Sequence, residues 1–172
     1  MKKWILAVVL LSVFVLTGCT DHIENGLDAL KAENYKEAKE SFKEEIKKGK
    51  NLDEAYRGLG IACYELNEYE VAIHAFEQAL KNEAEETATL YNMLGVCHMQ
   101  MGEYKKALDV YQKALTVKTI AKETKQEIQY NLIVVYEKML DWDAAKEQMR
   151  LYREAYPDDE RVKKESDFLE TR

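Results

Sequence analysis

The sequence predicts an all-α protein built from antiparallel helix pairs, on three observations. The 172 residues include a single proline, a residue common in turns, so its scarcity favours helices joined by short connections. The strong helix formers Ala, Glu, Lys and Leu dominate after residue 20. Glycine-centred segments recur, with 34 residues from Gly26 to Gly60 and 35 from Gly60 to Gly95. This length suits one domain with a sizeable core.

Each recurring segment has the same internal order, which predicts two helices joined by a turn. A small residue lies midway along the first helix, an aromatic residue follows the turn, and an alanine and a second aromatic residue lie on the second helix. Small residues at these places let the two helices cross closely. Asn67 and Gly102 lie in the turns, where we expect left-handed backbone. The residues after each glycine are Tyr35, Ala38 and Phe42; Tyr69, Ala72 and Phe76; and Tyr104, Ala107 and Tyr111.

A fourth copy is degraded but readable. Val134 takes the place of the glycine, and the alignment makes the turn between the two helices one residue shorter than in the other copies. About five extra residues precede this copy, around residues 117–123. The residues that align it with the third copy are Tyr130-Asn131, which echoes Tyr91-Asn92, then Trp142 and Ala145.

These segments resemble the tetratricopeptide repeat (TPR), whose period is 34 residues. The resemblance implies a right-handed superhelix of about four antiparallel helix pairs, ended by a capping helix. Asp158 is expected to cap that helix, and Val162, Phe168 and Leu169 to cover the last pair. The expected bounds are 19–157 for the solenoid, with repeats at 19–52, 53–87, 88–121 and 126–157, and 158–172 for the capping helix and tail.

The first residues are typical of an export signal. Lys2 and Lys3 precede an apolar run over residues 4–17, shorter than the roughly 20 residues that span a bilayer. The segment Leu16-Thr17-Gly18-Cys19 resembles the lipobox of bacterial lipoproteins. That resemblance implies that residues 1–18 are a signal peptide and that Cys19 carries the lipid, with a diacylglyceryl group on its thiol. The alternatives are a plain secretory signal, or an uncleaved anchor with an incidental cysteine.

The lipoprotein resemblance also implies a location and a geometry. The mature domain is expected outside the cytoplasm, on the outer leaflet of the cell membrane or at the outer membrane of a two-membrane cell. Only a few residues separate Cys19 from the first repeat, and no Gly/Ser-rich tether lies between them. We therefore expect the superhelix to stand close to the bilayer.

Composition and motifs argue against several other functions. The formal net charge of −7 disfavours nucleic acid, whose binding requires Lys and Arg to neutralise phosphates. No catalytic constellation or phosphate loop occurs, so we expect neither an enzyme nor a cofactor. Cys63, Cys97 and His98 are predicted neighbours without a fourth ligand at metal-motif spacing, which favours buried thiols and a satisfied core histidine over zinc. A Cys63–Cys97 disulfide is the alternative, although helix spacing makes it difficult.

The TPR resemblance implies a concave groove lined by the first helix of each pair, and from it we predict a protein or peptide partner. The hypothesis is a lipid-anchored scaffold or adaptor in envelope or surface-complex assembly, and the open ends of a superhelix also allow self-association. The alternative is a receptor for a small molecule or cell-wall fragment, with a closed cavity around Tyr64 and Met99. The alternative for individual groove residues is packing between repeats. The predicted groove residues are Arg57, Ile61, Tyr64, Asn92, Val96, Met99, Asn131, Val135 and Lys138.

Overall fold

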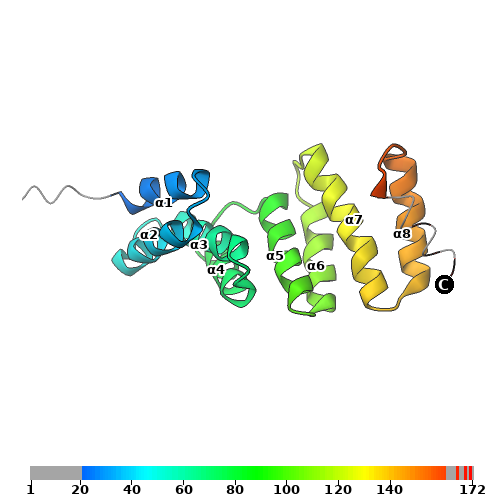
Figure 1. Ribbon diagram of the computed structural model, residues 1–172, viewed down its shortest axis with the longest axis horizontal. Coiled ribbons are helices and arrows are strands. Elements are labelled where there is room, and N and C mark those ends of the chain that lie inside the picture. Colours follow the sequence, from blue (N-terminus) through cyan, green and yellow to red (C-terminus); the bar gives the residue numbers. More distant parts are fainter. Residues whose placement is uncertain (1–20, 162–165, 167–168, 170, 172) are drawn as a thin grey trace, which may run out of the picture.

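The computed structural model describes residues 21–161, 166, 169 and 171, and the predicted signal peptide and Cys19 lie outside them. Eight α-helices and no strands occur in the described residues, as predicted (Figure 1). Successive helices form antiparallel pairs that stack into an elongated TPR-like solenoid, and we call the two members of a pair helix A and helix B. The helices are α1 (His22–Lys31), α2 (Tyr35–Lys48), α3 (Leu52–Glu65), α4 (Tyr69–Lys81), α5 (Ala88–Gln100), α6 (Tyr104–Leu115), α7 (Lys122–Lys138) and α8 (Trp142–Ala155).

All four turns between helix A and helix B have the same backbone structure. In the third turn, Gly102 is left-handed (φ 73°) and its N–H donates to the carbonyl of Met99, while the N–H of Glu103 donates to the carbonyl of His98. This pair of bonds is a Schellman motif, which satisfies the last carbonyls of helix A. The expectation of left-handed backbone at Asn67 and Gly102 is confirmed. The left-handed residues of the four turns are Glu33, Asn67, Gly102 and Leu140.

Close contact between glycine and an aromatic ring brings the helices of the first three pairs together. A Cβ atom added to Gly26 would lie 2.7 Å from the ring of Phe42, and one on Gly60 would lie 2.6 Å from the ring of Phe76. In the third pair the corresponding distance, from Gly95 to the ring of Tyr111, is 2.4 Å. All three rings are fully buried, so the crossing predicted from the small residues is present. The alanines of the B helices are likewise fully buried, and they are Ala38, Ala72, Ala107 and Ala145.

The fourth pair has the same turn but a different residue at the crossing. Its turn carries the same two backbone bonds, with the N–H of Leu140 donating to Glu137 and that of Asp141 to Tyr136. The prediction of a turn one residue shorter is therefore wrong. Counted from the turn, the residue at the glycine position is Ile133 and not Val134. Ile133 shares a buried cluster with Met149, which occupies the place of the aromatic residue on helix B.

The segment that follows α8 packs against the last helix pair. Asp159, and not the predicted Asp158, accepts the backbone N–H of Arg161 at 3.0 Å. Leu169 is buried in the cluster of the last pair, as expected, whereas Val162 and Phe168 lie outside the described residues. None of the helices in the described part of the chain combines the length and apolar character needed to cross a membrane.

Candidate functional site

The A helices carry an aliphatic residue at equivalent places, directly after the glycine position or its isoleucine counterpart. Each of these four residues is half-buried, so part of its apolar surface stays in contact with water. The A helices α1, α3, α5 and α7 contact one another in sequence, and this row therefore runs along the superhelix. We call the row the aliphatic stripe, and its members are Leu27, Ile61, Val96 and Val134.

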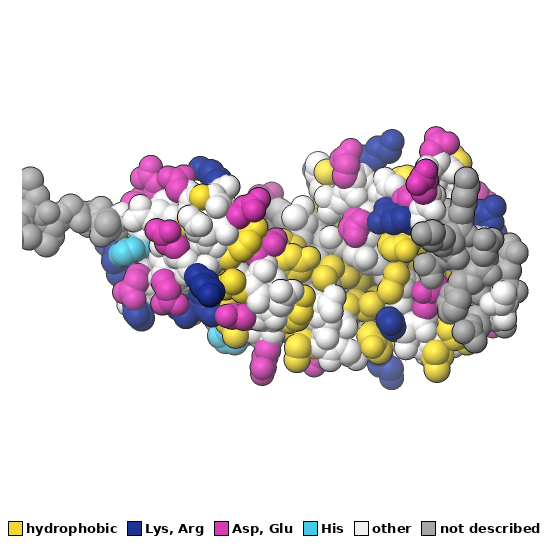
Figure 2. Space-filling view, viewed as in Figure 1, with side chains coloured by type: hydrophobic (Ala, Val, Ile, Leu, Met, Phe, Trp, Pro, Cys, Tyr) yellow, Lys and Arg dark blue, Asp and Glu magenta, His cyan; other side chains and the backbone are white. Residues whose placement is uncertain are grey.

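A second apolar row lies beside the stripe, three residues further along each helix A. It consists of Leu30, Tyr64 and Met99, all half-buried and packed against the core. In α7 the same place holds Glu137, so the second row ends at the third repeat. Figure 2 shows hydrophobic side chains gathered in a band across the middle of the molecule, over the elements between α3 and α7.

The groove residues predicted on α3 and α5 are exposed or half-buried. Arg57 is exposed and lies 3.7 Å from Glu54 in an ion pair. Residue counting from Gly26 would also have found Leu27 and Leu30, which the prediction omitted. The remaining predicted residues of these two helices are half-buried, and they are Ile61, Tyr64, Asn92, Val96 and Met99. Their role in binding stays a prediction.

The groove residues predicted on α7 are displaced by one position. Val135 is fully buried and corresponds to the buried Cys97, so its assignment to the groove is corrected. Asn131 is half-buried and Lys138 is exposed. The error follows from aligning Tyr130-Asn131 with Tyr91-Asn92. Counting back from Trp142 places Tyr130 and Val134 at the groove positions instead.

Asn131 nevertheless takes part in a contact between neighbouring A helices. Its Nδ2 donates to Oδ1 of Asn92 at 3.2 Å, which joins α7 to α5. The pair keeps amide donors and an acceptor for further hydrogen bonds. Two asparagine side chains beside an apolar band are therefore able to bond polar groups of a bound segment.

The hydroxyl of Tyr111 has no hydrogen-bond partner among the described residues, although the side chain is fully buried. Burial raises the pKa of Tyr111, and the nearby acidic groups of Tyr64 and Glu127 raise it further. Phe42 and Phe76 occupy the same place in the first two repeats without a hydroxyl. This hydroxyl is thus a polar atom that the packing of the repeat does not require.

Arg161 contacts both helix A of the fourth repeat and the segment after α8. Its guanidinium lies 4.4 Å from the centre of the Tyr130 ring and forms ion pairs with Glu127 at 3.0 Å and Asp159 at 2.8 Å. Tyr152 donates its hydroxyl to Asp159 as well. We call Tyr152, Asp159 and Arg161 the C-terminal clasp. Hydrogen bonds to Arg161 hold the pKa of Asp159 well below its usual range, and burial raises the pKa of Tyr152 to about 12.

The two described cysteines and His98 are buried within the repeat domain. Cys63 and Cys97 are free and buried, and burial raises the pKa of their thiols to about 11 and about 12. Such thiols stay protonated and unreactive at neutral pH. His98 is buried, with Nδ1 2.7 Å from Oε2 of Glu103. Within the described ranges no group of three or more His, Cys, Asp or Glu side chains could hold a metal ion.

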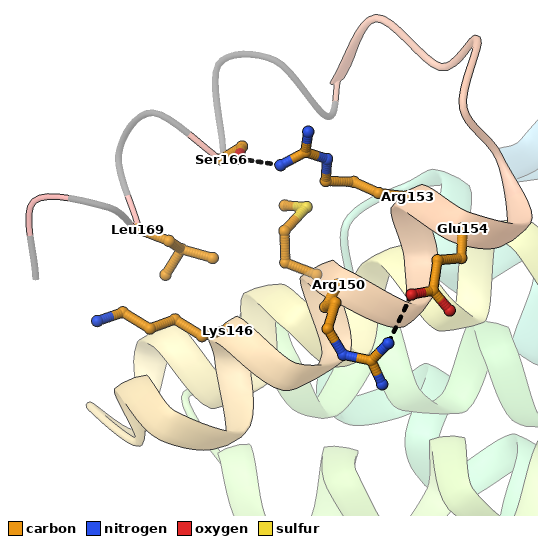
Figure 3. Close-up of a pocket in the computed structure, with 7 residues that line it drawn as sticks. Lys146, Arg150, Arg153, Glu154, Ser166 and Leu169 are labelled. Carbon is orange, nitrogen blue, oxygen red and sulfur yellow. Dashed lines mark hydrogen bonds and ion pairs between the residues drawn. The ribbon is translucent and has the colours of Figure 1, made fainter.

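A cavity of about 590 Å³ lies between α8 and the C-terminal segment (Figure 3). Ion pairs and hydrogen bonds occupy much of its wall, with Arg150 bonded to Glu154 at 2.6 Å and Arg153 to Ser166 at 3.1 Å. It includes neither Tyr64 nor Met99, around which the alternative of a small-molecule receptor predicted a cavity. The lining residues are Lys146, Met149, Arg150, Arg153, Glu154, Ser166 and Leu169.

Comparisons with known proteins agree with this architecture. A family model described as tetratricopeptide repeat matches residues 23–73 and 59–122, and a second model of that description matches residues 127–159. None of the curated proteins compared with the chain matches it.

Several solved structures are similar to the chain. A crystal structure of MamA protein has 20% sequence identity and a TM-score of 0.75, and the match covers 86% of this chain and 78% of that one. A tetratricopeptide repeat protein from Parabacteroides merdae has 20% identity and a TM-score of 0.71, over 87% of this chain and 57% of that one. A further structure, of MamA AMB-1, has 16% identity and a TM-score of 0.65, over 80% and 73% of the two chains. Identities of this size support a shared fold and nothing finer.

Proposed function

We propose that this chain, which belongs to the tetratricopeptide-repeat family, is a lipid-anchored scaffold that binds a protein partner at the extracytoplasmic face of a membrane. The partner lies along the groove of the A helices, and binding holds it at the membrane surface during assembly of an envelope or surface complex. The tetratricopeptide-repeat fold is typical of protein–protein interaction, which supports recruitment of a partner as the activity.

The aliphatic stripe is the observation that carries this proposal. Four half-buried aliphatic residues lie at equivalent places of the A helices, and a partner that covers them removes their exposed apolar surface from water. Such burial contributes about 25 cal/mol for each Å². The Asn92–Asn131 pair beside the stripe supplies polar contacts that orient a bound segment.

The anchor part of the proposal rests on the sequence alone. Leu16-Thr17-Gly18-Cys19 matches the lipobox, and α1 begins at His22, three residues after Cys19. A lipid on Cys19 would therefore hold the first repeat near the bilayer. Acyl chains anchor with about 0.8 kcal/mol for each buried CH₂ group, so a doubly or triply acylated cysteine binds stably.

Photo-crosslinking in cells tests the groove. A photoreactive residue is placed at Tyr64 or at Met99, with the same residue at the exposed His74 of α4 as the outer-face control. We expect one discrete partner from the two groove positions and none from His74. Equal background from all three positions in a folded, membrane-bound protein would show that this face does not bind a protein.

Metabolic labelling tests the anchor separately. Cells fed an alkyne fatty acid should label the wild-type protein, and Cys19→Ser should lose both the label and membrane association. Cys63→Ser is the matched control, because its thiol is buried within the repeat domain. Labelling that survives Cys19→Ser would contradict lipidation at this residue and leave the groove proposal intact.

A further inference from the structure

We propose that the cavity between α8 and the C-terminal segment binds a single-chain amphiphile whose head is a carboxylate or a phosphate. We call it the α8 cavity. It shares no residue with the predicted groove, so the inference goes beyond the proposed function and does not depend on it. Its basis is the size of the cavity, the apolar part of its wall, and the two basic side chains in the wall that lack an acidic partner.

The wall of the α8 cavity follows one face of α8. Four lining residues are spaced three, one and three positions apart, which places them on the same side of the helix. The first and the last of them are two turns apart, about 10.5 Å along the helix axis. The volume of about 590 Å³ lies within the range of about 300–1,000 Å³ that is typical of small-molecule sites. The four residues are Lys146, Met149, Arg150 and Arg153.

Part of this wall is apolar. Met149 and Leu169 belong to the buried cluster of the fourth repeat, and both line the cavity. In Figure 3, the side chain of Leu169 points from the C-terminal segment into the space in front of α8. The aliphatic stems of Lys146 and Arg150 add to the apolar wall, because long basic side chains cover apolar surface while their charges stay in water. An alkyl chain bound here leaves water for apolar surroundings, which favours binding.

The charges around the cavity favour an anion, although the formal net charge of the whole chain is −7. Among the described residues, three basic side chains and one acidic side chain line it. Arg150 is neutralised within α8, since it bonds Glu147 at 2.8 Å and Glu154 at 2.6 Å. Lys146 and Arg153 have no acidic partner in the described part of the chain. Their charges are therefore open to a ligand.

Arg153 and Ser166 form the place for the anionic head. Nη1 of Arg153 donates to Oγ of Ser166 at 3.1 Å, so the other N–H groups of the guanidinium and the hydroxyl hydrogen are able to donate to one anion. Carboxylates and phosphates match the planar fork of donors that arginine presents. Met149 lies between Arg153 and Lys146 along α8, so the alkyl chain of a ligand held at this point covers Met149 and Leu169. A small inorganic anion would leave that apolar wall uncovered.

Calorimetric titration of the full chain with dodecanoate tests the inference. We expect one molecule bound per chain, and Arg153→Gln should weaken binding by about tenfold or more, because charge-assisted hydrogen bonds are lost. Arg57→Gln is the matched control, since it makes the same change of charge on α3, and it should leave the affinity nearly unchanged. Circular dichroism verifies that both variants are folded. Equal affinities of the wild type and Arg153→Gln, or binding of many molecules per chain, would overturn the inference.

A series of ligands separates the head from the chain. Dodecanol lacks the charge and acetate lacks the alkyl chain, and each should bind at least about tenfold more weakly than dodecanoate. Dodecyl phosphate distinguishes the two sources of the head: tighter binding than dodecanoate assigns the site to a phosphate-headed lipid, and weaker binding assigns it to a free fatty acid. Acetate that binds as tightly as dodecanoate would show a site for anions only. Dodecanol that binds as tightly would show that the head is not recognised, and either result would overturn the inference.

Methyl NMR with labelled methionine locates the ligand. The signal of Met149, assigned by its loss in Met149→Leu, should shift until the cavity is saturated with dodecanoate. The signal of Met101, in an exposed turn of the third repeat, should not shift. An unchanged Met149 signal, or equal shifts of both signals, would place the ligand elsewhere on the chain and overturn the site. None of these results bears on the groove, so failure of this inference leaves the proposed function to its own test.

Discussion

The first three repeats and the fourth differ in which helix carries the larger residue where helix A crosses helix B. In the first three repeats the large side chain is an aromatic ring on helix B, and in the fourth an isoleucine on helix A adds to the volume. In the second repeat, Gly60 on helix A leaves room for the ring of Phe76 on helix B. In the fourth repeat, Ile133 supplies the volume from helix A, and the flexible Met149 takes the place of the ring. Methionine suits this place because its unbranched chain adapts to irregular gaps. The pair of positions, and not either residue alone, therefore determines the packing.

The comparison extends to the cores. Most of the fully buried residues of the first three repeats belong to one cluster, which also includes Ile128, Leu132 and Val135 of α7. The outer half of the fourth repeat has a separate cluster around Ile133 and Met149. Leu169 of the C-terminal segment is buried in this second cluster. The packing of the fourth repeat is therefore divided between the two clusters.

Valine at the crossing should produce the largest difference between the two kinds of repeat. Gly60→Val is expected to lower the free energy of unfolding by about 3 kcal/mol, because the new Cβ lies 2.6 Å from the ring of Phe76. Ile133→Val, at the equivalent position, should cost about 1 kcal/mol through a lost methylene group. Urea unfolding followed by circular dichroism measures both. Equal losses would show that the crossing is not closer in the second repeat.

A double variant sharpens the same comparison. Phe76→Met in the Gly60→Val background recreates the kind of pair found in the fourth repeat. We expect it to recover about 1 kcal/mol relative to Gly60→Val alone, because the two positions share one volume. If the losses in free energy of unfolding from the two substitutions simply add, a smaller residue on helix B does not compensate for a larger one on helix A.

The C-terminal clasp of the fourth repeat should give the next largest effect. Asp159→Asn removes a charged acceptor from Arg161 and Tyr152, and it should cost about 2 kcal/mol at pH 7. Asp158→Asn, at an exposed neighbour, should cost almost nothing. The folded state depresses the pKa of Asp159, so its contribution is complete above the unfolded pKa and is lost as pH falls through the folded value. The difference between wild type and variant should therefore shrink below about pH 4.

The periodic features of the chain were predictable, and the long-range contacts were not. Glycine spacing and the aromatic residues after each turn predicted four helix pairs, because those residues act within one pair. The register of the fourth repeat was missed because Tyr130-Asn131 is a short, partly exposed match. The left-handed residue of the fourth turn is Leu140, a residue type that does not indicate such a turn, unlike Asn67 and Gly102. The clasp joins Arg161 to Glu127, 34 residues away, and a local pattern cannot reveal such a contact. Val135 was assigned to the groove because the same Tyr130-Asn131 alignment shifted α7 by one position.

Two buried tyrosines allow a test of single hydroxyl groups. The hydroxyl of Tyr111 lacks a partner among the described residues, whereas that of Tyr152 bonds Asp159. Tyr111→Phe should raise the free energy of unfolding by about 1 kcal/mol, and Tyr152→Phe should lower it by about the same amount. Thermal and urea unfolding of the two variants measure this difference in sign. Destabilisation by Tyr111→Phe would show that the hydroxyl has a partner, such as a bound water.

The turns of the third and fourth repeats should give the smallest effect, since only the backbone is involved. Leu140 is left-handed, with φ 61°, and its side chain is 67% exposed, whereas Gly102 occupies the same place at φ 73° with open space around it. Leu140→Gly relieves the strain of a branched side chain in this region and should stabilise the protein by about 0.5 kcal/mol. Gly102→Leu should destabilise it by about 1 kcal/mol, because it introduces the same strain. Thermal unfolding of both variants measures the two changes in stability, which should have opposite signs. If Leu140→Gly instead loses stability, apolar contacts of the leucine outweigh its backbone strain, and the two turns differ by packing and not by conformation.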